Sequence, residues 1–544
     1  MQKTDGFSRR AFLAGGAGVG AAMLQQPEHA GAEVPAFELD EVTLTGLQEG
    51  MASGKYTAHS LTELYLKRIE SVDGQGPALR SVLETNPDAL DIARKRDAER
   101  AAGRVRGPLH GVPVLIKDNI GTADRMETTA GSLALMGARP AKGAPLVARL
   151  INAGAVLIGK TNLSEWANFR STHSVSGWSG RGGQTRNPYA LDRSPSGSSS
   201  GSGAAIAANL AAIAVGTETD GSILSPSAAN SLVGIKPTVG LISRTGVVPL
   251  AHSQDTAGPM ARTVRDAAVL LGALICADAA DAATQVRGRR THSDYAAFLD
   301  PHGLKGKRIG IARKQFFGYS VPTDKIAEEA IEALKRAGAI LVDPADIPTA
   351  GQFDADELTV LLYEFKADLN HYLAGLGPQA LVHTLKEIIA FNEREKAREL
   401  PFFGQEHMLK AESLGPLTTP AYQKAREKCI KLSREQGIDA VMDKHQLDAL
   451  FAPTQGPVWL IDLANGDSGG GSSTSPAAVS GYPSITVPAG YYHGLPVGVS
   501  FFGRAWSEPT LIKIAYAFEQ ATQVRRPPTF PSSAAFPTSG KPTL

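Results

Sequence analysis

The sequence predicts an α/β protein whose sheet is covered on both faces by helices. Short runs of branched apolar residues alternate with longer segments in which apolar residues recur at helical spacing. The 544 residues are 42% hydrophobic and 20% charged, a composition typical of a globular protein with a large core. Because the chain has no internal repeat and no strong linker after residue 32, we expect residues 33–544 to form one domain.

Segments of the two kinds follow one another along the chain. We expect helices over residues 44–69, 86–103, 146–153, 263–274 and 323–337. We expect strands in the apolar runs 112–118, 154–159, 232–237, 307–312, 339–342, 449–453, 483–488 and 497–502. Residues 203–215 form an Ala/Ile/Leu run that is long enough for a buried helix, and the more charged residues 354–445 form a helical elaboration.

The N-terminus has the pattern of a twin-arginine export signal. The pair Arg9-Arg10 precedes a weakly apolar Gly/Ala-rich core, and Ala30-Gly31-Ala32 is a small-residue cleavage site. The core is too short to span a membrane, and no later window reaches about 18 apolar residues. We therefore expect residues 1–32 to be removed, leaving a periplasmic or secreted protein that begins near Glu33 and has no attachment to the membrane.

The charge balance and the cysteines limit the partners. A net charge of +1 lacks the basic excess of a nucleic-acid-binding surface, so we expect no nucleic-acid partner, and we expect a monomer. An oxidising compartment would permit a disulfide between Cys276 and Cys429, but a chain of this size does not need one. We favour two free, mostly buried thiols.

Three short motifs match known sites without the surroundings that those sites need. Residues 154–161 fit the phosphate-binding expression G-x-x-x-x-G-K-[ST], but Ala-Val-Leu-Ile in the middle is a strand interior rather than an open loop. Residues 466–470 match the nucleophile segment of chymotrypsin-like proteases. The Gly/Ser content of residues 466–475 is, however, typical of a flexible loop, which we expect to border the substrate entrance. Residues 197–201 fit the elbow G-x-S-x-G with Ser199 as nucleophile, but a Pro-broken loop precedes them where a strand is required.

A fourth set combines Lys117, Ser198 and Ser222. Lys117 ends an apolar run, and desolvation there would lower its pKa so that it could act as a general base. Ser222 lies on a turn of small residues, where backbone N–H groups could form an oxyanion hole. The residues alone equally allow a lysine that extends to solvent and a serine that caps a helix.

These segments resemble the amidase signature family. Its Gly/Ser-rich cluster, Ala-rich helix, nucleophile turn and Lys-Pro-Thr segment match residues 196–202, 203–215, 217–222 and 236–238. Further likeness at residues 109–119, 159–162, 481–488 and 494–498 extends the resemblance over about residues 42–525. The resemblance implies a large mixed β-sheet sandwiched between α-helices.

It also implies the roles of individual residues. Ser222 would be the acyl-enzyme nucleophile, Ser198, held on a cis peptide, would relay the proton, and Lys117 would be the base. The backbone N–H groups of Thr219, Asp220, Gly221 and Ser222 would form the oxyanion hole. The resemblance implies no cofactor and no metal.

The nucleophile turn departs from the commonest family pattern. Glu218 and Asp220 replace an Asp and a Gly, and Leu224 stands where an Arg is common. The missing Arg leaves Glu218 in need of another partner, and a carboxylate at Asp220 would hinder the oxyanion hole unless it points away. The segments 161–170, 182–188, 217–222, 362–366 and 403–406 are similar to the branch of bacterial peptide amidases, which release ammonia from peptide C-terminal amides.

Four functions stay open at this point. We favour an exported serine amidase that cleaves C-terminal carboxamides of peptides to the free acid and ammonia. The alternative within the same fold is a broader aliphatic or aryl amide hydrolase. A subunit of a tRNA-dependent amidotransferase is disfavoured by the export signal, and a periplasmic binding protein would bind amides without consuming them.

Overall fold

The fold is built on one large mixed β-sheet. A computed structural model describes residues 34–140 and 142–536, so the predicted export signal lies outside the described residues. Eleven strands of this part form a single sheet. In order across the sheet they are β1 (Val82–Thr85), β3 (Val156–Thr161), β2 (Pro113–Lys117), β6 (Ile213–Glu218), β8 (Thr256–Ala261), β7 (Val233–Lys236), β12 (Ser484–Tyr492), β13 (Leu495–Phe502), β11 (Ala449–Pro453), β9 (Arg308–Ile311) and β10 (Ile340–Val342).

Strand direction places several strand ends at one edge of the sheet. β2 runs parallel to both β3 and β6, whereas β8, β7, β12 and β13 pair with their neighbours in antiparallel fashion. The carboxyl ends of β3, β2 and β6 therefore meet, and Thr161, Lys117 and Glu218 are the last residues of these strands. Ligands of α/β sheets bind at this edge. A separate two-stranded hairpin consists of β4 (Trp178–Ser179) and β5 (Gly183–Gln184).

Helices cover the sheet, as the sequence predicts, and bury its apolar side chains. The helices of this layer are α1 (Leu44–Ala52), α2 (Ala58–Arg68), α3 (Ala89–Ala101), α4 (Pro145–Asn152), α5 (Ser200–Ala207), α6 (Leu224–Ala229), α7 (Val264–Leu274), α8 (Val321–Arg336), α15 (Ser475–Ser480) and α16 (Glu508–Thr522). The main core joins strand residues such as Ile213 and Phe501 to helix residues such as Leu271 and Phe518. None of the described helices is long and apolar enough to cross a membrane.

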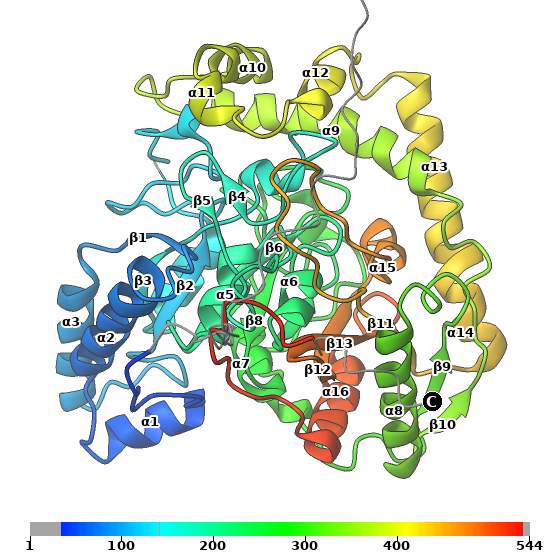
Figure 1. Cartoon of the computed structure of the whole chain (residues 1–544), viewed down its shortest axis with the longest axis horizontal. Helices are drawn as coiled ribbons and strands as arrows, with labels where there is room; N and C mark the ends of the chain where they lie inside the picture. The colour runs from blue at the N-terminus through cyan, green and yellow to red at the C-terminus, as the bar shows by residue number, and fades with distance from the viewer. Residues whose placement is uncertain (1–33, 141, 537–544) are drawn as a thin grey trace, which may run out of the picture.

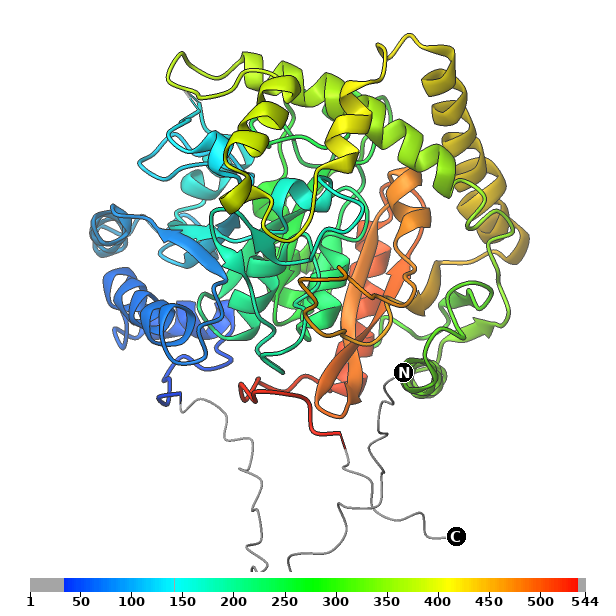
Figure 2. The same ribbon diagram turned by 45° about the horizontal axis from the view of Figure 1, so that its top comes forward.

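Most of the helical elaboration lies at one end of the molecule (Figure 1), but its last helix, α14 (Asp439–His445), packs near the sheet, where Met442 shares a buried cluster with Leu450 and Phe502. The elaboration comprises α9 (Asp354–Ala374), α10 (Leu385–Arg394), α11 (Lys396–Glu399), α12 (Glu406–Glu412), α13 (Pro420–Ser433) and α14. Figure 1 shows α9 crossing that end, with α10 to α12 beside it, and Figure 2 shows the same group from a second side. Phe365 and Leu369 of α9 share a buried cluster with Trp166 and Phe169, which anchors the group to the segment that follows β3.

Two predicted helices are interrupted. The pattern over residues 44–69 is split into α1 and α2, because Gly54 takes a positive φ of 78° and Thr57 caps the start of α2. The prediction of one helix over residues 203–215 is wrong. Asn209 leaves the helix with φ of 59°, where its side chain binds the Asp40 carboxylate, and the branched residues after it enter the buried strand β6.

Candidate active site

Lys117 ends in a buried position surrounded by hydroxyl and carbonyl groups. Its side chain has no exposed surface, and its Nζ lies 2.8 Å from Ser198 Oγ, 2.9 Å from Thr217 Oγ1 and 3.2 Å from the Thr217 carbonyl oxygen. Burial lowers the pKa of Lys117 from 10.5 to about 7, although the carboxyl groups of Asp255 and Glu218 oppose part of this change. Near neutral pH the amine can therefore be uncharged and accept a proton.

The segment that carries Ser198 passes close to other backbone. The Gly197–Ser198 peptide bond is cis, the arrangement that the family resemblance implies. A Cβ atom at Gly197 would collide with Ser164 Oγ, so a side chain does not fit there. The Ser199 N–H donates to the Ser222 carbonyl oxygen at 3.1 Å, and this bond holds the Ser198 segment against the nucleophile turn.

The turn from Thr219 to Ser222 leaves its amide groups free. Within the described part of the chain, the N–H groups of these four residues donate no hydrogen bond to protein. Gly221 has φ of +74°, and a Cβ there would lie 2.9 Å from Ser225 Oγ and 3.0 Å from Thr474 Oγ1. Unpaired N–H groups on a turn of this kind are the donors that an oxyanion requires.

Ser222 lies beside Ser198 without a hydrogen bond between the two hydroxyls in the described structure. Ser222 is 7% exposed, whereas Ser198 has no exposed surface. Hydrogen bonds of this kind commonly tighten only when a substrate is bound. The structure thus brings all three predicted catalytic residues to one buried place, at the edge where β2 and β6 end.

The two acidic residues of the turn have partners that face away from its amide groups. One carboxylate oxygen of Glu218 accepts the N–H groups of Ile223 and Leu224 at 2.7 and 3.0 Å. Burial raises the pKa of Glu218, and the charge of Lys236 opposes this. The backbone N–H groups thus occupy the place of the partner that the missing Arg would supply.

Asp220 is held from the opposite side of the turn. Its carboxylate oxygens accept the hydroxyls of Thr474 and Ser475, each at 2.6 Å. Burial raises the pKa of Asp220, and these two hydrogen bonds oppose the change. Because the carboxylate is engaged at the start of α15, it does not occupy the place of an oxyanion.

The three short motifs that match other kinds of site have structural roles here. Residues 154–161 form strand β3, and the buried Lys160 donates to the Ile120 carbonyl oxygen at 2.6 Å, so no phosphate cradle exists there. Ser199 Oγ donates to the Thr217 carbonyl oxygen at 3.0 Å, and no strand leads into it. In the loop 466–475, Asp467 accepts the N–H groups of Ser176 and of the Trp459 ring. The described cysteines, Cys276 and Cys429, are free thiols, as expected, although Cys276 is only partly buried.

Several site residues were not predicted from the sequence. Thr217 contacts Lys117 directly, and its position in the segment 217–222 is the feature of the sequence that could have indicated this role. Asn119 Nδ2 donates to the same Thr217 hydroxyl at 2.9 Å. Asp255 accepts the Thr219 hydroxyl at 2.6 Å, and burial raises the pKa of Asp255 to about 6. No motif in the sequence indicates Asp255, because only the fold brings it to the turn.

Known proteins share this chain's sequence and fold over most of its length. The family model described as Amidase matches residues 60–512. A crystal structure of native peptide amidase from Stenotrophomonas maltophilia is 53% identical, with a TM-score of 0.87, over 91% of this chain and 100% of that chain. A peptide amidase in complex with the competitive inhibitor chymostatin gives the same identity, coverage and TM-score. The probable amidase At4g34880 of Arabidopsis thaliana is 44% identical over 91% of this chain and 92% of its own length.

These matches also bear on the fold and on the class of enzyme. The mixed sheet between helices is the fold of the peptide amidase structures, which confirms the predicted fold class. The match of the family model extends from α2 to α16 and includes every predicted site residue. The chain belongs to the amidase family, and it is an amidase, a hydrolase of amide bonds.

Proposed function

We propose that this amidase hydrolyses the C-terminal carboxamide of peptides to the free acid and ammonia through an acyl-enzyme on Ser222. The observation that carries the proposal is the 2.8 Å contact between Lys117 Nζ and Ser198 Oγ, beside a turn whose four N–H groups donate to no described residue. The preference for peptides is supported by the 53% identity to peptide amidase over the whole of that chain.

In the first step, the neutral amine of Lys117 takes the proton of Ser198 Oγ while Ser198 takes the proton of Ser222. The Ser222 oxygen then bonds to the carbonyl carbon, and the N–H groups of the turn stabilise the oxyanion. When the carbon–nitrogen bond breaks, the leaving nitrogen receives a proton from Ser198, which is reprotonated by Lys117. Ammonia departs and an ester of Ser222 remains.

In the second step, water replaces ammonia. Its proton passes through Ser198 to Lys117 as its oxygen bonds to the ester carbon. The Ser222 oxygen leaves and recovers a proton by the same route, so the enzyme returns to its starting state. The overall reaction consumes one amide and one water and yields one acid and one ammonia.

The burial of the site favours a small leaving group. Lys117 and Ser198 have no exposed surface, and Ser222 is 7% exposed. Ammonia needs far less room beside the nucleophile than a continuing polypeptide does. We therefore expect primary carboxamides to react and internal peptide bonds to be spared.

Ammonia release from a peptide amide tests the triad. S222A and K117A should each lose at least 1,000-fold in kcat, the scale seen when a unit of this kind loses one member. Circular dichroism and elution volume should match the wild type, because each change removes atoms without adding bulk. Near-normal turnover by either folded variant would refute the assignment.

The alternative is a broader aliphatic or aryl amide hydrolase. Rates on a peptide amide, benzamide and acetamide separate the two functions, and the matching free-acid peptide serves as the control for internal cleavage. A kcat/KM for the peptide amide at least 100-fold above both small amides supports the proposal, and equal values support the alternative. Competitive inhibition by chymostatin, the inhibitor bound to the related peptide amidase, would further support a peptide site.

Two other functions give different results. A binding protein would bind peptide amides without releasing ammonia, and a serine-reactive phosphonate would not label Ser222. A tRNA-dependent amidotransferase subunit would need cytoplasmic partners, which conflicts with the proposed twin-arginine export to the periplasm. Replacing Arg9-Arg10 with Lys-Lys should retain the protein in the cytoplasm in an unprocessed form, and unchanged export would refute that route.

A further inference from the structure

A loop beside the nucleophile turn is joined to α9 along three consecutive residues. We call this contact the seam; it consists of residues 252–255 and the acidic residues of α9 that they contact. Each of residues 252–254 donates a hydrogen bond to one of these carboxylates. The pairs are His252 N–H with Asp368, Ser253 N–H with Glu364 and the Gln254 side chain with Glu357, at 2.8, 2.9 and 2.8 Å. The three acids lie on one face of α9, so the helix and the loop are fixed in register.

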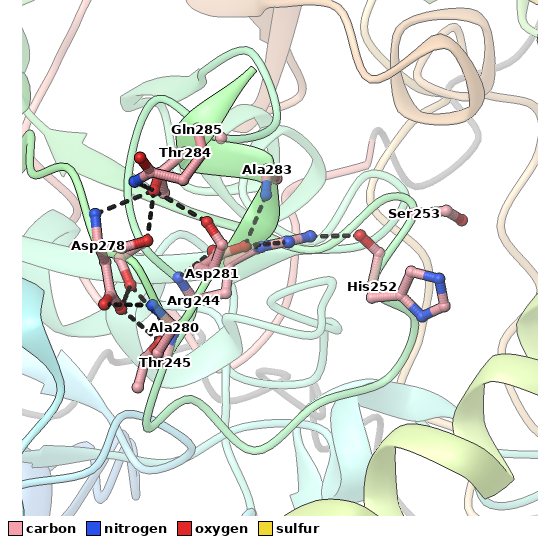
Figure 3. A network of polar contacts seen from close by, with 12 residues as sticks. Arg244, Thr245, His252, Ser253, Asp278, Ala280, Asp281, Ala283, Thr284 and Gln285 are labelled. Carbon is pink, nitrogen blue, oxygen red and sulfur yellow. Dashed lines mark hydrogen bonds and ion pairs between the residues drawn. The ribbon is translucent and has the colours of Figure 1, made fainter.

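The opposite side of the loop is held by an arginine. Arg244 Nε donates to Asp281 at 2.8 Å, and another nitrogen of the same guanidinium donates to the His252 carbonyl oxygen. Figure 3 shows Arg244 lying between Asp281 and His252. His252, Asp255 and Asp368 also line a cavity of 690 Å³, so the seam forms one wall of that cavity. The loop is thus restrained from both sides.

The seam contacts the nucleophile turn at its first residue. Gln254 Nε2 donates to the Thr219 carbonyl oxygen at 3.3 Å, in addition to its bond to Glu357. Asp255 accepts the Thr219 hydroxyl at 2.6 Å, and the N–H groups of Leu250 and Ala251 fix that carboxylate. A shift of α9 would therefore be transmitted to the turn.

The second residue of the turn meets α9 directly. The buried carboxyl groups of Asp220 and Glu357 lie within reach of a hydrogen bond between them. Two carboxyl groups can share such a bond only when one of them carries a proton. Asp220 accepts two hydroxyls, whereas Glu357 accepts one amide N–H, so the negative charge is better stabilised on Asp220.

We propose that Glu357 is a positioning residue of the amidase reaction, whose neutral carboxyl group donates a hydrogen bond to Asp220 and so holds the N–H groups of Thr219 to Ser222 in place. This inference rests on the proposed function of the same turn. Glu357 acts through Asp220 and does not touch the reacting atoms.

Other charged groups near the pair favour this single negative charge. Lys236 of β7 favours an ionised Asp220, whereas Glu218 of β6 and Asp354 of α9 oppose a second charge. The Cys429 thiol of α13 also lies near Glu357, and burial raises its pKa, so it stays neutral. Burial and the charge of Asp220 raise the pKa of Glu357 well above its usual value.

Two isosteric substitutions test the direction of the hydrogen bond. In E357Q, the amide N–H can donate to Asp220 while the amide oxygen accepts from Gln254, which reproduces the neutral carboxyl pattern. In D220N, an N–H group replaces one of the oxygens that accept donors. We expect kcat to fall less than about 5-fold in E357Q but about 10- to 100-fold in D220N, with KM changed less than about 3-fold in both. E332Q, on the exposed face of α8, is the matched control and should behave as wild type.

The pH profile separates positioning from general stability. We expect wild-type kcat to fall once the pH is high enough to ionise Glu357, which would then repel Asp220, and we expect E357Q to lack that fall. An E357Q profile that superimposes on the wild type from pH 6 to 10 would overturn the proposal. So would a kcat for D220N equal to or above that of E357Q.

Labelling of Ser222 by a fluorophosphonate provides a readout that needs no amide substrate. The labelling rates should follow the same order, with wild type and E357Q well above D220N, because the oxyanion hole also stabilises attack on phosphorus. If wild-type protein is labelled but does not cleave peptide amides, the substrate proposal fails while this series still tests Glu357. Equal labelling of all variants would overturn the role of Glu357 itself.

Discussion

Replacing Lys117 with methionine should abolish activity and yet stabilise the protein near neutral pH. Methionine has a similar length, carries no charge and suits a site without exposed surface. The wild-type lysine must give up its proton or bury a charge there, because its pKa falls from 10.5 to about 7 on folding. K117M avoids that cost.

The size and the sign of the effect follow from this change in pKa. One pKa unit corresponds to 1.36 kcal/mol, so the buried amine costs roughly 4–5 kcal/mol of unfolding free energy at pH 7. K117M loses three hydrogen bonds, to Ser198 and Thr217, worth about 1 kcal/mol each. The net expectation is that K117M is more stable than wild type by about 1–2 kcal/mol at pH 7.

The difference should reverse as the pH rises. Between the folded pKa of about 7 and the unfolded value of 10.5, the unfolded lysine binds more protons than the folded one. Wild-type stability therefore increases with pH in this window by about 1.4 kcal/mol per pH unit relative to K117M. By pH 9 the wild type should have gained about 2.3 kcal/mol of unfolding free energy relative to the variant, which then becomes the less stable of the two.

Paired urea unfolding curves at pH 7 and pH 9, followed by tryptophan fluorescence, measure this difference, because all other titrating groups are common to both proteins. Wild-type kcat/KM should rise tenfold per pH unit below about pH 7, as the neutral amine becomes populated, and should stop rising above that pH. A stability difference that stays constant between the two pH values would refute the uncharged Lys117, and so would an acid limb centred near pH 10.

Three further changes have defined outcomes. S222A should bind a peptide amide, by isothermal calorimetry, with about the affinity of wild type, because the hydroxyl is used only in the covalent step; loss of binding would argue for another nucleophile. G221A places a side chain on a residue with φ of +74° and should lower kcat about 100-fold and the free energy of unfolding by about 1–3 kcal/mol. An unchanged kcat would show that the N–H groups of this turn do not stabilise the oxyanion. R170L leaves the buried carboxyl groups of Glu165 and Glu399 without their shared cation and should cost about 3–5 kcal/mol, measured by thermal unfolding, whereas a change below 1 kcal/mol would show that both acids are already neutral.

Patterns in the sequence locate the strands that carry the site. The apolar runs 112–118 and 154–159 become β2 and β3, because continuous branched residues suit strands buried on both faces. The run 203–215 has the same apolar character throughout, and periodicity therefore gave no signal for the end of α5 at Ala207. The Asp40 contact of Asn209 that ends this helix comes from a distant part of the chain.

Residues joined to the site by the fold alone could not be predicted. Gln254 and Asp255 follow an ordinary loop sequence, and Glu357 is one of several acids at the start of a long helix. Their importance arises because the helical elaboration lies over the nucleophile turn, a fact of tertiary packing. The unusual carboxylates at Glu218 and Asp220 could be noticed in the sequence, but only the structure supplies their partners at Ile223 and Thr474.

Three buried lysines stand at the ends or near the ends of strands, and burial alone does not select the base among them. Lys117, Lys160 and Lys236 are all fully buried, and burial lowers their pKa values to about 7, 8 and 8. Among the described residues, the lysines that form ion pairs are Lys307, Lys366, Lys428 and Lys513, and none of the three buried lysines is among them. Lys160 donates to the Ile120 carbonyl oxygen and to Thr128, and Lys236 donates to the carbonyl oxygens of Pro237 and Tyr482.

Only the hydrogen-bond partners distinguish the three. A carbonyl oxygen has no proton to give, so Lys236 has nothing to accept from its contacts, and the Thr128 hydroxyl beside Lys160 leads to no serine on a turn with free N–H groups. Lys117 contacts the hydroxyl of Ser198, and the neighbouring Ser199 N–H donates to the Ser222 carbonyl oxygen. A lowered lysine pKa is thus a property of this whole edge of the sheet, and we propose that Lys117 alone serves as the base, because Ser198 lies between it and the turn that carries Ser222.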